Sequence, residues 1–194
     1  PALPQYFDVT VPAGIDFTYT NGATGSRYMP ECMGSGAAFI DYDGDGLLDL
    51  YILNGTYLDT ARAPAGPLPR NAMYHNQGDG TFVETTEQTR TGDTGYGMGA
   101  AVGDPDNDGD PDLYVTNYGP NVFYRNDGNG TFTDITAAAG TGDAGWGANA
   151  AFVDYDNDGD LDLYVANYMD FRVEQNRECF QSTARAYCGP TAYP

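Results

Sequence analysis

The 194-residue sequence predicts an all-β protein built from repeated units of four antiparallel strands. Its 26 glycines, 12 prolines and 16 tyrosines are typical of short strands joined by tight turns. An acidic stretch occurs three times, at residues 41–51, 104–114 and 154–164, and a motif that ends in Gly-Thr-Phe occurs twice, at residues 74–82 and 124–132. Such internal repeats decide the architecture.

Each acidic stretch has Asp at positions 1, 3, 5 and 9 and Gly at position 6. Carboxylates on alternate residues, a backbone carbonyl from position 7 and a carboxylate from position 9 are the ligands of a Ca²⁺ loop. Glycine permits the sharp turn at position 6. A solvated acidic turn is the alternative, but three copies in one register argue against it. The expected ligands are Asp41, Asp43, Asp45, Leu47 and Asp49; Asp104, Asp106, Asp108, Asp110 and Asp112; and Asp154, Asp156, Asp158, Asp160 and Asp162.

These loops differ from EF-hands, which place a bidentate Glu at position 12 between two helices. Position 12 is here Ile52, Val115 or Val165. The residues after each loop are β-branched or aromatic, and those before it are small and apolar. Each loop is therefore expected to join two adjacent strands.

One repeat unit reads as strand 99–103, acidic loop, strand 112–117, a turn at Gly119-Pro120, strand 121–125, an Asx-Gly hairpin and strand 131–135. Four antiparallel strands in some fifty residues match one β-propeller blade. We expect an N-terminal outer strand and lead-in (1–35), blade 1 (36–98), blade 2 (99–148), a partial blade 3 (149–170) and an irregular Cys-containing tail (171–194). The outer strand is expected at residues 6–10, and the whole is an incomplete propeller in one chain.

The net charge of −20 argues against a nucleic-acid partner, because phosphate binding needs a basic surface. Half of the 28 acidic residues lie in the three loops, where cations would bind. No apolar run is long enough to span a membrane. No signal peptide is present, and a start at Pro1 is what a processed or trimmed product would show.

The three cysteines indicate the compartment. Cys179 and Cys188 flank a short loop and are expected to pair, which favours an extracellular or cell-surface location, or the periplasm. Cys32 is then either a buried thiol or an intermolecular link. Weak acidic loops also need more Ca²⁺ than the cytosol holds free.

Other residues give no catalytic arrangement. His75 is the only histidine and occupies a strand position matched by Arg125, so we expect a structural or surface role and no enzyme. Tyr96 and Trp146 are equivalent repeat positions. They are expected to pack between blades, although an aromatic rim that binds sugars is the alternative.

The Asp-x-Asp-x-Asp-Gly-x-x-Asp-Leu-Tyr motif, preceded by a Gly/Ala-rich strand and followed by Asn-x-Gly-x-Gly-Thr-Phe, resembles the FG-GAP/VCBS repeats of integrin-α-like β-propellers. The Cys-Gly-Pro element within residues 179–190 is similar to that of bacterial relatives of cartilage acidic protein (ASPIC-type proteins). The resemblance covers nearly the whole chain. It implies Ca²⁺ loops at the blade periphery and a role in adhesion or assembly. Such propellers usually have about seven blades, whereas this chain holds fewer than three.

We therefore expect an exported Ca²⁺-binding repeat protein with a structural, self-assembly or adhesion role. Head-to-tail oligomers or filaments would form by donation of the strand at residues 6–10 to a neighbour. The alternative is a carbohydrate- or protein-binding module of a larger secreted protein.

Overall fold

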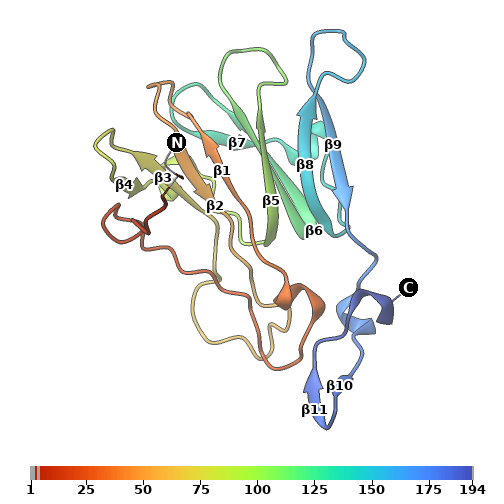
Figure 1. Ribbon diagram of the computed structural model, residues 1–194. Coiled ribbons are helices and arrows are strands. Elements are labelled where there is room, and N and C mark those ends of the chain that lie inside the picture. The colour runs from red at the N-terminus through yellow and green to blue at the C-terminus, as the bar shows by residue number, and fades with distance from the viewer. Residues whose placement is uncertain (1–2, 4, 194) are drawn as a thin grey trace.

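The computed structural model describes residues 3 and 5–193. Three antiparallel sheets lie side by side in it, in the order in which they follow along the chain (Figure 1). The first sheet has the order β1-β2-β3-β4. Its strands are β1 (Ala37–Ile40), β2 (Asp49–Ile52), β3 (Ala72–Asn76) and β4 (Phe82–Glu84). The four strands expected for a blade are therefore all present here, and the first acidic loop joins β1 to β2.

The second sheet has the order β5-β6-β7, with β5 (Tyr96–Gly103), β6 (Asp112–Asn126) and β7 (Phe132–Asp134). The 15-residue β6 covers both middle strands of the expected unit. Fully extended it would span roughly 50 Å, yet the backbone N–H of Asn126 donates a hydrogen bond of 2.8 Å to the Asp112 carboxylate. The element therefore folds back on itself, at Gly119, whose φ is 105°.

The third sheet contains only β8 (Gly147–Val153) and β9 (Asp162–Asn167) among the residues that the structure describes. The tail adds a hairpin of β10 (Cys179–Gln181) and β11 (Ala184–Ala186). Three short 3-10 helices are η1 (Met29–Cys32), η2 (Val173–Gln175) and η3 (Pro190–Ala192). The expected Cys179–Cys188 disulfide is confirmed. No helix in the described part of the chain has the length and apolar character needed to cross a bilayer.

A one-turn helix that the sequence did not lead us to expect follows the last strand of each complete blade. These helices are α1 (Thr86–Thr89) and α2 (Thr136–Ala139). The first threonine of each ties it to the strand before the last one: the Oγ1 of Thr86 accepts the N–H of Met73 in β3, and that of Thr136 accepts the N–H of Phe123 in β6. Both helices end in a left-handed residue, Arg90 or Gly140.

The core lies between the sheets, because alternate residues of each strand face the next blade. Ile40, Tyr51 and Leu53 pack on Leu113 and Val115. The next interface repeats this arrangement, with a cluster formed by Ala101, Tyr114, Phe123, Ala150, Phe152, Leu163 and Val165.

The tyrosine at the third position of β2, β6 and β9 shows where this packing stops. The hydroxyl of Tyr51 donates to the Thr91 carbonyl (2.8 Å), and that of Tyr114 donates to the Thr141 carbonyl (2.6 Å). Both rings are fully buried. The equivalent Tyr164 is 67% exposed. The outward face of the third sheet is therefore open in the described chain.

Tyr96 and Trp146 are both buried, at 1% and 2% exposure. The hydroxyl of Tyr96 donates to the carbonyls of Asn21 and Pro30 in the lead-in. The Trp146 ring meets Phe171 of the tail edge-on, with ring centroids 5.9 Å apart. The two rings therefore join the blades to the lead-in and the tail.

Two expectations are wrong. Residues 6–10 form no strand, and Tyr6 and Phe7 are 90% and 77% exposed. A strand exists only where a neighbour supplies the inter-strand hydrogen bonds, and no described segment pairs with these residues. The thiol of Cys32 is exposed instead of buried, because it stands at the end of η1 and only donates to the Met29 carbonyl.

Candidate metal centres

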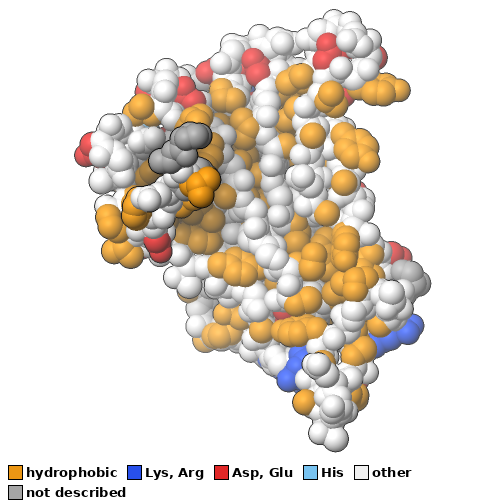
Figure 2. All heavy atoms as spheres, viewed as in Figure 1, with side chains coloured by type: hydrophobic (Ala, Val, Ile, Leu, Met, Phe, Trp, Pro, Cys, Tyr) orange, Lys and Arg blue, Asp and Glu red, His pale blue; other side chains and the backbone are white. Residues whose placement is uncertain are grey.

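The three acidic loops emerge from the same end of the three sheets, at the top of Figure 1, whereas the tail with β10 and β11 lies at the opposite end. Figure 2 shows the resulting charge distribution, with acidic side chains along the upper end and basic ones gathered near the tail. The common position follows from the repeat, because each loop joins the first strand of a sheet to the second.

The carboxylate at position 1 shapes each loop by accepting backbone N–H groups. Asp104 accepts hydrogen bonds from Asp108 (3.1 Å) and Gly109 (3.0 Å). Asp154 makes the equivalent pair of bonds, and Asp41 accepts from Gly46 (3.0 Å). These bonds curl the loop so that its carboxylates face one another.

Glycine at position 6 has the expected positive φ in all three loops, from 85° to 98°. Position 4, which the sequence reasoning missed, is also left-handed: Gly44 has a φ of 73°, Asn107 of 56° and Asn157 of 61°. The available signal was the residue type, because Gly and Asn are the residues that tolerate this conformation best.

The loops bring carboxylates within 4.8 Å of one another. The groups are Asp41, Asp43 and Asp45; Asp104, Asp106 and Asp108; and Asp154, Asp156 and Asp162. Each group could hold a metal ion. One buried oxygen, Oδ1 of Asp41, has no hydrogen-bond partner, and a cation at this place would satisfy it. The residues present therefore fit a metal.

Position 7 was expected to contribute only its carbonyl, with its side chain in solvent. The N–H groups of Leu47, Asp110 and Asp160 donate to the carboxylate two residues earlier, at 2.8 to 2.9 Å. The side chain of Asp160 is exposed but accepts a hydrogen bond from Asn107 (2.8 Å), which connects the second and third loops.

The position-9 carboxylates differ most between the loops. Asp49 and Asp112 are 0% and 1% exposed because the folded-back next strand covers them, with N–H groups of Asn76 and Asn126 donating at 2.8 Å. Asp162 is exposed, because no described strand covers it.

The position-9 carboxylates also differ in whether they accept a hydrogen bond from the backbone N–H at position 2 of the same loop. The N–H of Tyr42 donates to Asp49 (3.2 Å), and that of Tyr155 donates to Asp162 (3.0 Å). The second loop has Pro105 at this position. Because proline has no backbone N–H, Asp112 lacks this donor.

Burial and like charge act together on these carboxyls. Burial, together with the charges of Asp106, Asp108 and Asp104, raises the pKa of Asp112 to about 7, although the Asn126 hydrogen bond acts to lower it. Burial also raises the pKa of Asp49. Crowded carboxylates of this kind are stabilised by a bound divalent cation.

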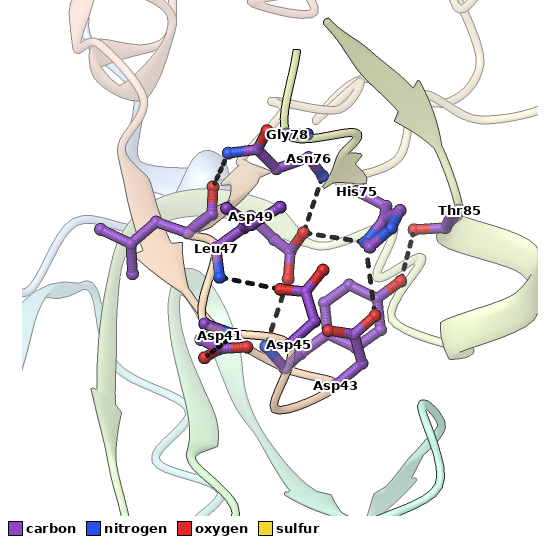
Figure 3. A network of polar contacts seen from close by, with 12 residues as sticks. Asp41, Asp43, Asp45, Leu47, Asp49, His75, Asn76, Gly78 and Thr85 are labelled. Carbon is purple, nitrogen blue, oxygen red and sulfur yellow. Dashed lines mark hydrogen bonds and ion pairs between the residues drawn. The ribbon is translucent and has the colours of Figure 1, made fainter. Parts of the chain in front are cut away.

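His75 was expected to be structural or on the surface, and the structure places its ring beside the first loop (Figure 3). Its Nδ1 lies 3.0 Å from Oδ1 of Asp49 and 3.4 Å from Oδ2 of Asp43. The neighbouring Asn76 donates through Nδ2 to the Leu48 carbonyl. The Gly-Thr-Phe motif thus begins with residues that support the acidic loop, a tertiary relation that spacing alone did not reveal.

The comparisons with known proteins agree with this geometry. The family model described as FG-GAP-like repeat matches residues 41–115 and 104–165, so each match runs from one acidic loop into the strand after the next loop. No curated protein matches the chain. The two overlapping matches cover more than half of the chain, which therefore belongs to the FG-GAP-like repeat family.

Proposed function

We propose that this chain is an exported Ca²⁺-binding propeller-type module with a structural or adhesion role. All expected ligands are oxygens, and each loop combines several carboxylates with a carbonyl at position 7. Ca²⁺ takes six to eight oxygen ligands in flexible loops of this kind, whereas Mg²⁺ demands tighter geometry. We assign one Ca²⁺ to each of the three loops.

The observation that carries this proposal is the carboxylate of Asp112. It is almost fully buried, and three further aspartates raise its pKa. The arginine of the same blade, Arg125, pairs with Asp127 instead. A bound cation would offset the cost of burying this charge.

Calorimetry and melting curves test the proposal. We expect Ca²⁺ titration of the chelator-treated protein to show saturable binding, and millimolar Ca²⁺ to add roughly 1–3 kcal/mol per loop to the free energy of unfolding by mass action. Mg²⁺ at the same concentration should do much less. A melting curve that is the same in chelator and in Ca²⁺ would refute Ca²⁺ binding.

An extracellular location fits the Cys179–Cys188 disulfide and the calcium level outside cells. We further propose a relationship to the bacterial cartilage acidic protein-like group, on the Cys-Gly-Pro element that begins at Cys188. The adhesion or structural role follows from the family, whose propellers are typically non-catalytic.

We also propose self-association. The outer edge of β9 is unpaired among the described strands, and Tyr164 on the adjoining face is exposed where its equivalents are buried. The N-terminal segment carries the apolar side chains of Tyr6, Phe7 and Val9 into solvent. Strand addition of this segment to the β9 edge of a second copy would cover both, and the contact is head-to-tail.

Light scattering on the full chain and on a variant lacking residues 1–10 tests the assembly. We expect oligomers of the full chain at micromolar concentration and a monomer after the deletion, with Ca²⁺ binding to the second loop retained. A full-length monomer, or an unchanged oligomer after the deletion, would contradict strand donation.

A glycan- or protein-binding role is the second candidate, and one observation favours it. A hollow of about 680 Å³ is lined by Tyr118, Trp146 and Tyr168, of which Tyr168 is exposed, and by polar residues such as Asn167 and Arg172. Aromatic faces beside planar polar groups suit sugars. A glycan array with the wild type and Tyr168→Ala tests this, and absence of any Tyr168-dependent signal would argue against it.

A further inference from the structure

The first loop has a nitrogen donor where the second loop has none. Nδ1 of His75 and carboxylate oxygens of Asp43 and Asp49 all lie within 4.8 Å of one another. The equivalent residue of the second blade is Arg125, which turns to Asp127 (3.2 Å). Of the loops in the described chain, the first is thus the one with a mixed set of oxygen and nitrogen donors.

The ring of His75 is held in place by its surroundings. His75 pairs with Val83 in the sheet, and Tyr42 meets the imidazole edge-on with ring centroids 6.0 Å apart. Tyr42 is itself packed in the core, and its hydroxyl contacts Thr85 across the blade at 3.4 Å. Figure 3 shows the ring turned toward the two carboxylates. The His75 side chain is 24% exposed, so an ion can reach it from solvent.

Donor chemistry then separates the first loop from the others. Ca²⁺ is a hard ion that takes oxygen ligands, whereas imidazole suits first-row transition metals. A site that adds an imidazole to its carboxylates therefore suits such ions better than an all-oxygen site does. The buried, unpartnered Oδ1 of Asp41 adds a further oxygen at the same loop.

We propose that the first loop, although it also accepts Ca²⁺, binds a first-row transition-metal dication in preference to it, with Nδ1 of His75 as the nitrogen ligand. The second and third loops keep Ca²⁺. This inference rests on the proposal that the loops bind cations, and it names the ion class of one of them. His75 is then the residue that sets the selectivity of the site.

The competing role for His75 is positioning. Its Nδ1–H would donate to Asp49 and hold that carboxylate for Ca²⁺, as residues around metal ligands commonly do. Both roles predict weaker metal binding at the first loop when His75 is replaced. They differ in which metal is lost and in whether the imidazole itself senses the ion.

The experiment titrates Co²⁺ into the protein at saturating Ca²⁺, in a Cys32→Ser background that removes the exposed thiol. We expect one equivalent of Co²⁺ to bind and to displace one Ca²⁺. His75→Arg, which imports the residue of the second blade, and His75→Gln should each weaken Co²⁺ binding by about 10-fold or more. Ca²⁺ binding at the other two loops should stay unchanged in both variants. Arg125→His is the reciprocal variant and should improve Co²⁺ binding at the second loop.

Proton NMR gives the direct readout, because the chain has a single histidine. Coordination through Nδ1 predicts strongly contact-shifted imidazole signals in the Co²⁺ form, which are absent in His75→Gln. If the protein with His75 binds Co²⁺ no better than the His75→Arg variant does, the inference is overturned. It is also overturned if the imidazole signals stay in their ordinary range. Binding of three equivalents of Ca²⁺ by the same protein would in that case still support the proposed function. If Ca²⁺ bound to none of the loops, the proposed function itself would be refuted.

Discussion

Replacement of Asp112 by Asn separates two effects of this carboxyl group: the cost of burying its charge in the metal-free protein, and its contribution as a calcium ligand. In the metal-free protein, burial and three neighbouring aspartates hold the pKa of Asp112 at about 7, against an ordinary value of 3.8. The folded protein therefore keeps a proton on this carboxyl at pH values where the unfolded chain has released it. Stability must fall as the pH rises from about 4 to above 7, because the folded state binds more protons in that window.

The difference between these two pKa values corresponds to roughly 4 kcal/mol of unfolding free energy at alkaline pH. Asn cannot ionise, and its carbonyl can still accept the Asn126 N–H that Asp112 accepts. We therefore expect Asp112→Asn to be more stable than the wild type in chelator at pH 8. For a chain of this size the gain corresponds to a rise in melting temperature of roughly 10 °C. In Ca²⁺ the order should reverse, because the variant has lost a ligand.

Melting curves from pH 4 to pH 8, in chelator and in millimolar Ca²⁺, measure both effects. Asp110→Asn is the matched control, because it removes the same charge from a half-buried position of the same loop. If metal-free wild type and Asp112→Asn lose stability equally between pH 4 and pH 8, the buried carboxyl is not the group responsible and the reasoning is refuted.

Three further outcomes follow from the same geometry. Asp104→Ala should lower Ca²⁺ affinity in calorimetry far more than Asp110→Ala, because Asp104 also accepts two loop N–H groups; equal losses would mean that the loop positions are misassigned. Tyr114→Phe should cost roughly 1–2 kcal/mol in chemical denaturation, since the hydroxyl of this buried ring donates to the Thr141 carbonyl, while Tyr164→Phe should change nothing in the monomer. The third loop should bind Ca²⁺ more weakly than the first two, because Asp162 is exposed, and Asp162→Asn should remove the weakest step of a titration.

The sequence predicted what depends on short-range spacing. Aspartates at fixed positions, Gly46 and its equivalents, and the apolar residues on either side identified the loops, the strands that they join and the blade. These features are local, because turn chemistry and strand alternation act over a few residues.

What the sequence could not predict depends on partners that are distant in the chain. Residues 6–10 match an outer strand in pattern, yet without a neighbour they form none. His75 and Arg125 share one repeat position and turn to different carboxylates, Asp49 in one blade and Asp127 in the other. Spacing places a residue in a repeat, whereas its contacts decide what the side chain does.

The position-9 aspartate connects metal binding to the completeness of a blade. In the first two sheets the third-strand segment covers this carboxylate and donates an N–H to it, through Asn76 or Asn126. In the third sheet the N–H of Tyr155 is the one donor to Asp162 among the described residues. A strand added at the β9 edge would bury Asp162 and supply the missing donor, which would raise the affinity of the third loop. Because such coupling is reciprocal, calcium at the third loop must in turn favour the added strand. Calcium binding at the third loop and assembly would then be thermodynamically coupled, so that each would promote the other.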